Sequence, residues 1–295
     1  MPGPTMTPLR WPEMTADGIT SAVAYDGELP RGRWHRGVPS TSLTVVIATA
    51  GPVSIGGGTA TAPDVRQRLT SLIGGLQHHA AWTWEEGRSS GVHLSLSPLA
   101  ARRLLGCPAA ALAPGTDGHT TVGLDVLLGR SAEDLREELA EVDDAQQAQV
   151  LRQWVRSRCT DRGRDPRPEV AHAWRRAQAS GGRMRVTALA REVLLSERQL
   201  RTLFHRELGV GPGQVLRLAR FERSRARIGA GLDATIADTA AECGYADHSH
   251  LVRDWRELIG CSPTAWLAEE RRNVALLTDP WVMTGREERA CGRRG

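Results

Sequence analysis

The chain has 295 residues, a length that predicts two domains, each with room for a hydrophobic core. Its 38 basic residues are all arginine and unevenly divided: residues 1–150 hold 11 against 16 acidic residues, whereas residues 151–295 hold 27 against 18. The N-terminus lacks the apolar core of a secretory signal, no apolar run approaches the roughly 20 residues that span a bilayer, and the five cysteines are scattered without a CxxC pair. The sequence therefore argues against a secreted or membrane-spanning protein, and we expect free thiols in the cytoplasm.

Short β-type runs dominate the first hundred residues. Residues 1–20 are rich in proline and threonine, and we expect a disordered leader there. The runs that follow alternate with turn signals and predict a small antiparallel β unit, either a barrel or a sandwich. They lie at residues 21–25, 43–49, 71–76, 79–84 and 92–96. The glycine-rich segment "GPVSIGGGTATAP" at residues 51–63 is interpreted as a flexible loop or turn.

Helical periodicity begins at Pro98. A short helix ends at Gly106, an acidic helix covers residues 131–141, and an amphipathic helix covers residues 144–158. With the β unit they define an α+β domain over residues 21–158. The last two helices either pack behind the β unit, which we favour, or form a dimerisation face. Residues 159–169 combine glycine, proline and alternating charge and are interpreted as a linker.

The region of residues 170–272 contains one pattern twice. The first copy reads "LSERQLRTLFHRELGVGP" and the second "ADHSHLVRDWRELIGCSP", and matched residues such as Phe204 and Trp255 are 51 positions apart. Ser196 and Asp247 can each cap the first turn of a helix, and each copy ends in Gly-x-x-Pro, which stops one helix and starts the next. Small-residue helices at residues 187–193 and 236–243 precede the copies. A short helix, a turn and an exposed helix form a helix-turn-helix unit.

Each copy has one apolar face and one free face. The free faces are expected to contact DNA, and the positive charge of this half is what phosphate neutralisation requires. The residues concerned are Arg198, Arg201, Thr202 and His205 in the first copy, and His248, Ser249, Val252, Arg253 and Arg256 in the second. A helix at residues 214–229 joins the copies, and some of its arginines are expected to contact phosphate while others are solvated or paired with Glu222. These are Arg217, Arg220, Arg223, Arg225 and Arg227.

These residues resemble the DNA-binding domain of the AraC/XylS family of transcription regulators. The likeness runs over residues 184–272 and is most specific in the second copy, where Gly244, Tyr245, Asp247, Trp255 and Pro263 stand at signature positions. It implies an all-α domain of about seven helices with two helix-turn-helix units. In the first turn, Leu194 and Leu195 stand where the family commonly has a glycine. Residues 72–113 also resemble an uncharacterised N-terminal domain found in many such regulators.

The function that the resemblance implies is sequence-specific DNA binding that regulates transcription. We predict an activator that reads double-stranded promoter DNA in two adjacent major grooves, in the cytoplasm and associated with the nucleoid. The residues 21–158 would sense an effector or dimerise, so a small molecule, a second copy of the chain and RNA polymerase are candidate partners. Residues 273–295 are expected to form a flexible tail.

Two alternatives were considered from the residues. An enzyme such as a DNA-repair methyl acceptor would need an activated, metal-bound cysteine cluster, but the first half holds only Cys107. His78, His79, Glu86 and His93 are a poor metal site, because adjacent histidines on a regular strand point to opposite faces. We therefore expect no enzyme activity, cofactor or metal. A protein-interaction module without DNA affinity is the other alternative.

Overall fold

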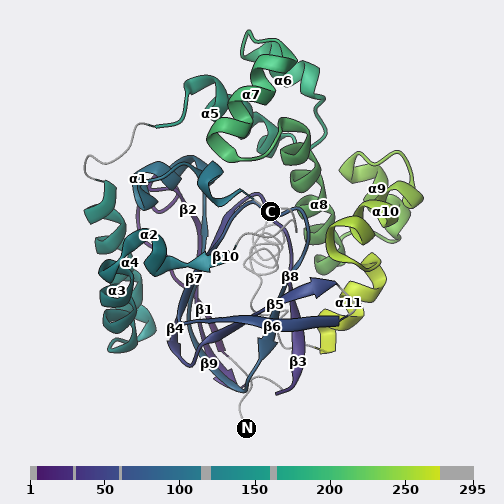
Figure 1. Ribbon diagram of the computed structural model, residues 1–295. Helices are drawn as coiled ribbons and strands as arrows, with labels where there is room; N and C mark the ends of the chain where they lie inside the picture. The colour runs from purple at the N-terminus through teal and green to yellow at the C-terminus, as the bar shows by residue number, and fades with distance from the viewer. Residues whose placement is uncertain (1–4, 29–30, 60–61, 114–120, 160–164, 273–295) are drawn as a thin grey trace, which may run out of the picture.

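The fold combines antiparallel sheets in the N-terminal half with helices in the C-terminal half, as seen in a computed structural model that describes residues 5–28, 31–59, 62–113, 121–159 and 165–272 (Figure 1). The α+β class predicted from the sequence is confirmed. The strands are β1 (Thr5–Pro8), β2 (Ile19–Glu28), β3 (Arg33–Gly37), β4 (Leu43–Ala50), β5 (Val53–Thr59), β6 (Ala62–Leu69), β7 (Ser71–Gly74), β8 (Ala81–Glu85), β9 (Arg88–Leu96) and β10 (Thr121–Gly123).

The strands form two sheets. The larger has the order β1-β2-β9-β4-β7-β10 and the smaller the order β3-β8-β5-β6. Neighbouring strands run antiparallel, with Val45 of β4 opposite Leu94 of β9 and Trp34 of β3 opposite Trp84 of β8. Two interpretations of the sequence were wrong. Residues 51–63 are mostly not a loop, because β5 and β6 pair as a hairpin there, and His79 lies before β8 rather than in it.

The expected disordered leader is also a wrong interpretation for residues 5–20. β1 pairs with β2 through Thr5 and Asp26, and the side chains of Leu9 and Trp11 are buried in the main core. Proline at the end of an edge strand does not disturb the sheet, because its missing N–H is not needed by a neighbour. Residues 1–4 lie outside the described part of the chain.

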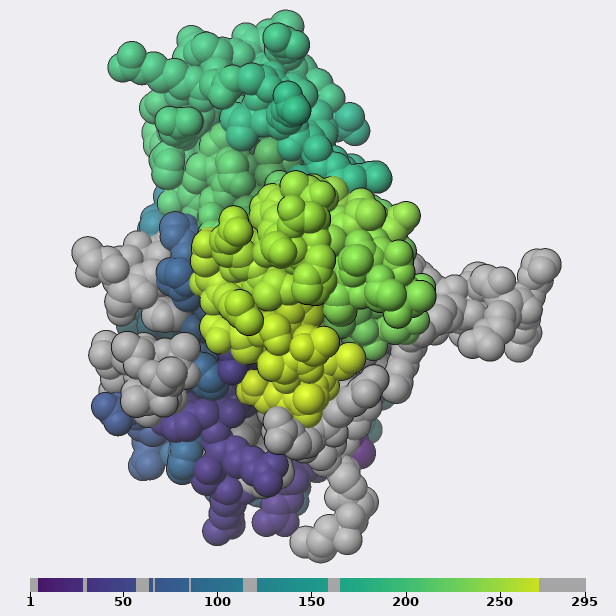
Figure 2. All heavy atoms as spheres, turned by 90° about the vertical axis from the view of Figure 1, so that its right-hand side faces the viewer, coloured from purple at the N-terminus to yellow at the C-terminus, as the bar shows by residue number. Residues whose placement is uncertain are grey.

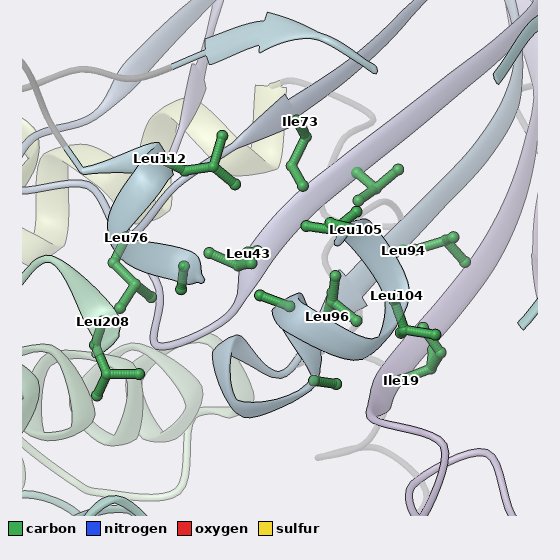
Figure 3. Packing of buried hydrophobic residues seen from close by; sticks show 14 of the residues in the cluster. Ile19, Leu43, Ile73, Leu76, Leu94, Leu96, Leu104, Leu105, Leu112 and Leu208 are labelled. Carbon is green, nitrogen blue, oxygen red and sulfur yellow. The ribbon is translucent and has the colours of Figure 1, made fainter. Parts of the chain in front are cut away.

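One face of the larger sheet packs against helices. Ile19, Leu43, Ile73, Leu94 and Leu96 on this sheet meet apolar side chains of the helices that follow it (Figure 3). The helices are η1 (Pro98–Ala100), α1 (Ala101–Leu105), η2 (Ala109–Leu112), α2 (Leu124–Leu128), α3 (Arg130–Ala140) and α4 (Asp144–Cys159). Leu135 and Leu139 of α3 and Leu151 of α4 are buried in this core, which agrees with packing behind the β unit. The predicted linker falls partly outside the described residues, at 160–164.

Seven helices follow in the described C-terminal part. They are α5 (Pro168–Ala179), α6 (Val186–Glu192), α7 (Glu197–Leu208), α8 (Pro212–Ala230), α9 (Ile236–Cys243), α10 (His248–Ile259) and α11 (Pro263–Arg272). Figure 1 shows α8 between two groups, with α5 to α7 at its one end and α9 to α11 beside it. The predicted tail at residues 273–295 lies outside the described residues. In the part of the chain that is described, no helix is long and apolar enough to cross a bilayer.

The helix α8 buries charged side chains where the two halves of the protein meet. Glu222 and Arg225 are 3% and 2% exposed, and Glu270 of α11 is also buried. From the N-terminal half, Thr41 donates to Glu222 through its backbone N–H, at 3.0 Å, and through its hydroxyl, at 2.5 Å. Charged groups are costly to bury without partners, so this contact satisfies a carboxyl group that α8 alone leaves short of donors.

The buried charges predict a dependence of stability on pH. Burial, opposed by Arg225 and reinforced by Glu269, raises the pKa of Glu270 from 4.5 to about 7. At Glu270 the folded protein holds a proton that the unfolded chain releases, so this group contributes a fall in stability as pH rises between these values, by at most about 1.4 kcal/mol per pH unit. The buried histidines His35 and His93, whose pKa values burial lowers to about 4, contribute a rise in stability over the lower part of the same range. The contribution of Glu270 is measured as a difference: in urea unfolding across this range, Glu270→Gln should have a more positive slope of stability against pH than the unaltered chain. Glu141→Gln, at an exposed site, is the control and should leave the slope unchanged.

Candidate nucleic-acid interface

The two helix-turn-helix units have different turns. In the second unit Gly244 adopts the left-handed conformation, with φ of 78°, and Tyr245 N–H donates to Ala240 O at 2.9 Å. In the first unit Leu194 takes the same place with φ of 56°, and Leu195 N–H donates to Ala190 O at 3.0 Å. A Cβ atom makes this conformation unfavourable, so the first turn is strained where the second is not. The second turn also has one more residue before its helix cap.

The exposed helix of each unit begins at a side-chain cap. Ser196 accepts from Gln199 N–H at 3.2 Å, and the Gln199 side chain accepts from Ser196 N–H at 2.9 Å, which completes a capping box. Asp247 accepts from His250 N–H at 2.7 Å at the start of α10. Gly209 and Gly260 end the two helices in the left-handed conformation. Local signals in the sequence therefore define both ends of both helices.

The apolar faces of α7 and α10 anchor them to the domain. Leu200, Phe204 and Leu208 of α7 are buried in the main core. Trp255 of α10 lies between Phe221 and Trp266, with ring centroids 5.0 and 5.4 Å away, and its indole N–H donates to Ser224 Oγ at 2.9 Å. The buried aromatic rings fix α10 against α8 and α11, and they leave the opposite face of the helix free.

The candidate DNA-contacting residues lie on the free faces. All nine are exposed except Val252, which is half-buried. Within the described part of the chain, the guanidinium groups of four of them have no carboxylate partner. The four are Arg198 and Arg201 on α7 and Arg253 and Arg256 on α10. Figure 2 shows the second unit on the face toward the viewer, with the first unit above it. The hydroxyl of Thr202 donates to Arg198 O at 3.0 Å, within its own helix.

The arginines of α8 have structural partners instead. Arg217 pairs with Asp254 and Glu257, each at 2.5 Å, and Arg227 pairs with Asp233 at 2.5 Å. Arg220 lies over the ring of Tyr245, 5.3 Å from its centroid. Arg225 is buried beside Glu222, whose charge opposes the lowering of the arginine pKa by burial. None of the five is fully exposed, and Arg223 is half-buried. Arg217 and Arg220 hold the second unit against α8, a role that the sequence did not indicate.

The residues of the N-terminal half that were considered as metal ligands or as a nucleophile do not form a catalytic or metal-binding site. Among the described residues there is no group of three or more side chains suited to hold a metal. Burial lowers the pKa of His93 to about 4, so the imidazole is neutral at pH 7. Burial also raises the pKa of the half-buried Cys107 thiol, which is the reverse of what an activated nucleophile requires. Trp82 and Trp84 share one face of the small sheet, and Arg36 lies over the Trp82 ring at 4.6 Å.

Comparison with known proteins supports the same interpretation. Residues 189–269 match a protein family described as a helix-turn-helix domain. A structure of ToxT from Vibrio cholerae is 10% identical, with a TM-score of 0.50, and the match covers 84% of this chain and 98% of that one. A structure of a ToxT variant in its apo form, also from Vibrio cholerae, is 13% identical with a TM-score of 0.50, covering 84% of this chain and 97% of that one. No curated protein sequence matches the chain.

The fold and the matched region together define the class. The chain is a DNA-binding transcription regulator, with an N-terminal domain of antiparallel sheets and a helical C-terminal domain. Its helix-turn-helix domain is of the AraC type, so the resemblance seen in the sequence is confirmed.

The strained first turn predicts a stabilising substitution. Leu194 is 92% exposed, so its side chain contributes little packing to offset the left-handed backbone. Leu194→Gly should relieve a strain of about 1–2 kcal/mol, less the greater freedom of glycine in the unfolded chain, for a net gain of up to about 1 kcal/mol. Thermal unfolding would measure it. Leu194→Ala keeps the Cβ atom, so it should give no gain; an equal gain from both variants would place the effect in the side chain instead.

Proposed function

We propose that this protein binds promoter DNA in a sequence-specific manner through the free faces of α7 and α10, and that it activates transcription. The observation that carries the proposal is the set of four exposed arginines, two on each capped helix, that have no carboxylate partner among the described residues. By contrast, none of the five arginines of α8, a few residues away in sequence, is fully exposed, and Arg217 and Arg227 are paired with carboxylates. Arginines left free on two equivalent faces are suited to an anionic partner that meets both units.

The residues on these faces have distinct proposed roles. Arg198, Arg201 and Arg253 can make bidentate hydrogen bonds to guanine or bind phosphate, and Arg256 is suited to phosphate nearer the helix end. Val252 offers an apolar contact for a thymine methyl group. The remaining polar side chains can bond to base edges or to the backbone. They are Thr202, His205, His248 and Ser249.

The proposed binding mode places the two units in adjacent major grooves. The helix α8 has 19 residues and therefore a length of about 28 Å. Successive major grooves on one face of B-DNA are about 34 Å apart. The first unit lies at one end of α8 and the second beside it, and we propose that this arrangement spaces the two exposed helices for two grooves of one duplex. A single chain would then do what a dimer of simpler regulators does.

The N-terminal domain is proposed to sense a small-molecule effector or to dimerise. It contacts both units: Arg102 of α1 pairs with Glu207 of α7 at 2.9 Å, and the backbone N–H of Ala80 donates to Leu258 O of α10 at 2.8 Å. A change in this domain therefore has direct routes to the DNA-binding helices. RNA polymerase is the proposed partner for activation.

Selection of binding sites from random duplex DNA by the full chain tests the proposal. Two short enriched blocks about one helical turn apart are expected if both units read bases. One block would restrict base reading to a single unit. No enrichment would contradict the proposed function. The affinity for DNA should also fall by orders of magnitude between about 50 and 200 mM salt, because several phosphate contacts are expected. Binding that does not change with salt concentration would favour a protein-interaction module instead.

Substitution of Arg253 gives a sharper prediction. Arg253→Ala should cost about 1–3 kcal/mol of binding free energy and relax base preference at one position of the site. Competition binding against single-base variants of the selected site would measure both. Arg88→Ala, which removes an exposed pair with Asp26 in the N-terminal domain, is the control and should change neither. A uniform loss across all sequences would assign Arg253 to phosphate instead.

A further inference from the structure

The C-terminal end of α10 is bonded to the N-terminal domain. The last four carbonyl groups of any α-helix lack partners within the helix. In α10 these belong to Arg256, Glu257, Leu258 and Ile259, and the first is satisfied nearby, by Gly260 N–H at 2.9 Å. The other three accept hydrogen bonds from residues 178 to 223 positions earlier in the chain.

Three different donors of the N-terminal domain make these bonds. His79 Nδ1–H donates to Glu257 O at 2.9 Å. The backbone N–H of Ala80 donates to Leu258 O at 2.8 Å. The guanidinium group of Arg36 donates to Ile259 O. Together with Gly260 N–H, these donors satisfy all four of the last carbonyl groups of α10. We call Arg36, His79 and Ala80 the cap residues.

The cap residues are themselves held in place. Arg36 lies in β3, opposite Trp82 of β8, and Ala80 directly precedes β8. The Arg36 side chain is buried, stacks on the Trp82 ring and pairs with Glu269 of α11 at 3.1 Å. Arg36 is therefore held by a strand of the small sheet, and His79 and Ala80 belong to the segment that leads directly into the neighbouring strand β8. A cation at the end of α10 is also favoured by the negative end of the helix dipole.

The end of the first exposed helix is different. On α7 the N-terminal domain contacts the side chain of Glu207 through Arg102, and Ala110 and Ala113 lie against Gly209 so closely that a Cβ atom there would be 2.7 Å from Ala113 Cβ. This is packing and an ion pair. Among the described residues, direct bonding of helix carbonyl groups by the other domain is found at α10.

We propose that the cap residues position α10 for reading DNA, so that the N-terminal domain completes the second helix-turn-helix unit. The inference rests on the proposed function, because the position of α10 matters only if its free face reads bases. A helix of 12 residues is marginal alone, and its direction depends on what holds both of its ends. Asp247 fixes the start, and the cap residues fix the end. They act through α10 and are positioning residues.

The test uses the full chain, three variants at the contact between the domains and two variants that assign the blocks of the DNA site. Arg36→Met keeps an apolar stem over Trp82 and removes the donor to Ile259. His79→Ala removes the donor to Glu257 from an exposed site and is not expected to affect folding. Glu269→Gln is the matched control, because it weakens the ion pair of Arg36 but leaves the bond to Ile259. Arg253→Ala and Arg201→Ala identify which block of the selected DNA site each unit reads.

Two measurements are made on each of the three contact variants. In the selected DNA, Arg36→Met should lower the discrimination at the second unit's block by about fivefold or more, while the first block keeps its preference. His79→Ala should act in the same direction with a smaller effect. Amide hydrogen exchange over residues 256–262 should become faster in both variants. Glu269→Gln should change neither quantity.

Several outcomes would overturn the proposal. Unchanged discrimination and exchange in Arg36→Met would mean that the bonds do not position α10. Tighter DNA binding would mean that the contact restrains the helix. An equal loss at both blocks with a lower Tm would mean general destabilisation. If the unaltered chain selects no DNA sequence, the proposed function fails, and the positioning role fails with it; exchange over residues 256–262 would then show only whether the bonds order the helix end.

Discussion

The burial of charge along α8 is the constraint on which the arrangement of the domains depends. Glu222 and Arg225 lie inside the protein, and the carboxyl group of Glu222 receives two hydrogen bonds from Thr41 of the other domain. Removing a partner from a buried charged group costs several kcal/mol, which is more than a typical surface contact supplies. The two halves are therefore joined by a polar contact that tolerates little displacement, and the apolar core continues from the sheet into α5, α7 and α8 around it.

The two helix-turn-helix units are copies in sequence but not in their surroundings. The first has a strained turn at Leu194, packs against η2 near Gly209 and is joined to α1 by the pair between Arg102 and Glu207. The second has a glycine in its turn, an aromatic cluster around Trp255 and hydrogen bonds from the N-terminal domain. The repeated sequence pattern gives the same local structure twice, whereas the different contacts around the two units stabilise them to different extents.

The sequence predicted what local interactions determine. The caps at Ser196 and Asp247, the glycine stops and the helical period are short-range features, so the positions of α7, α9 and α10 could be inferred from them. The candidate interface on these helices followed. The partners of Arg217 and Arg36 could not be predicted, because they depend on which distant segments the fold brings together. The hairpin of β5 and β6 was missed because glycine-rich composition masks strand pairing, and the leader was missed because a few buried residues such as Trp11 decide its place.

The bonds between the sheet and the end of α10 also limit how freely the two domains can be exchanged in protein engineering. Two-domain regulators are natural candidates for chimeras in which the sensor domain of one protein is fused to the DNA-binding domain of another. A chimera that kept residues 170–272 but replaced the N-terminal half would leave the carbonyl groups of Glu257, Leu258 and Ile259 to water or to chance donors. The domain border that matters in this protein is thus not the linker in the sequence but a surface in space, and a graft would have to carry Arg36, His79 and Ala80 with it.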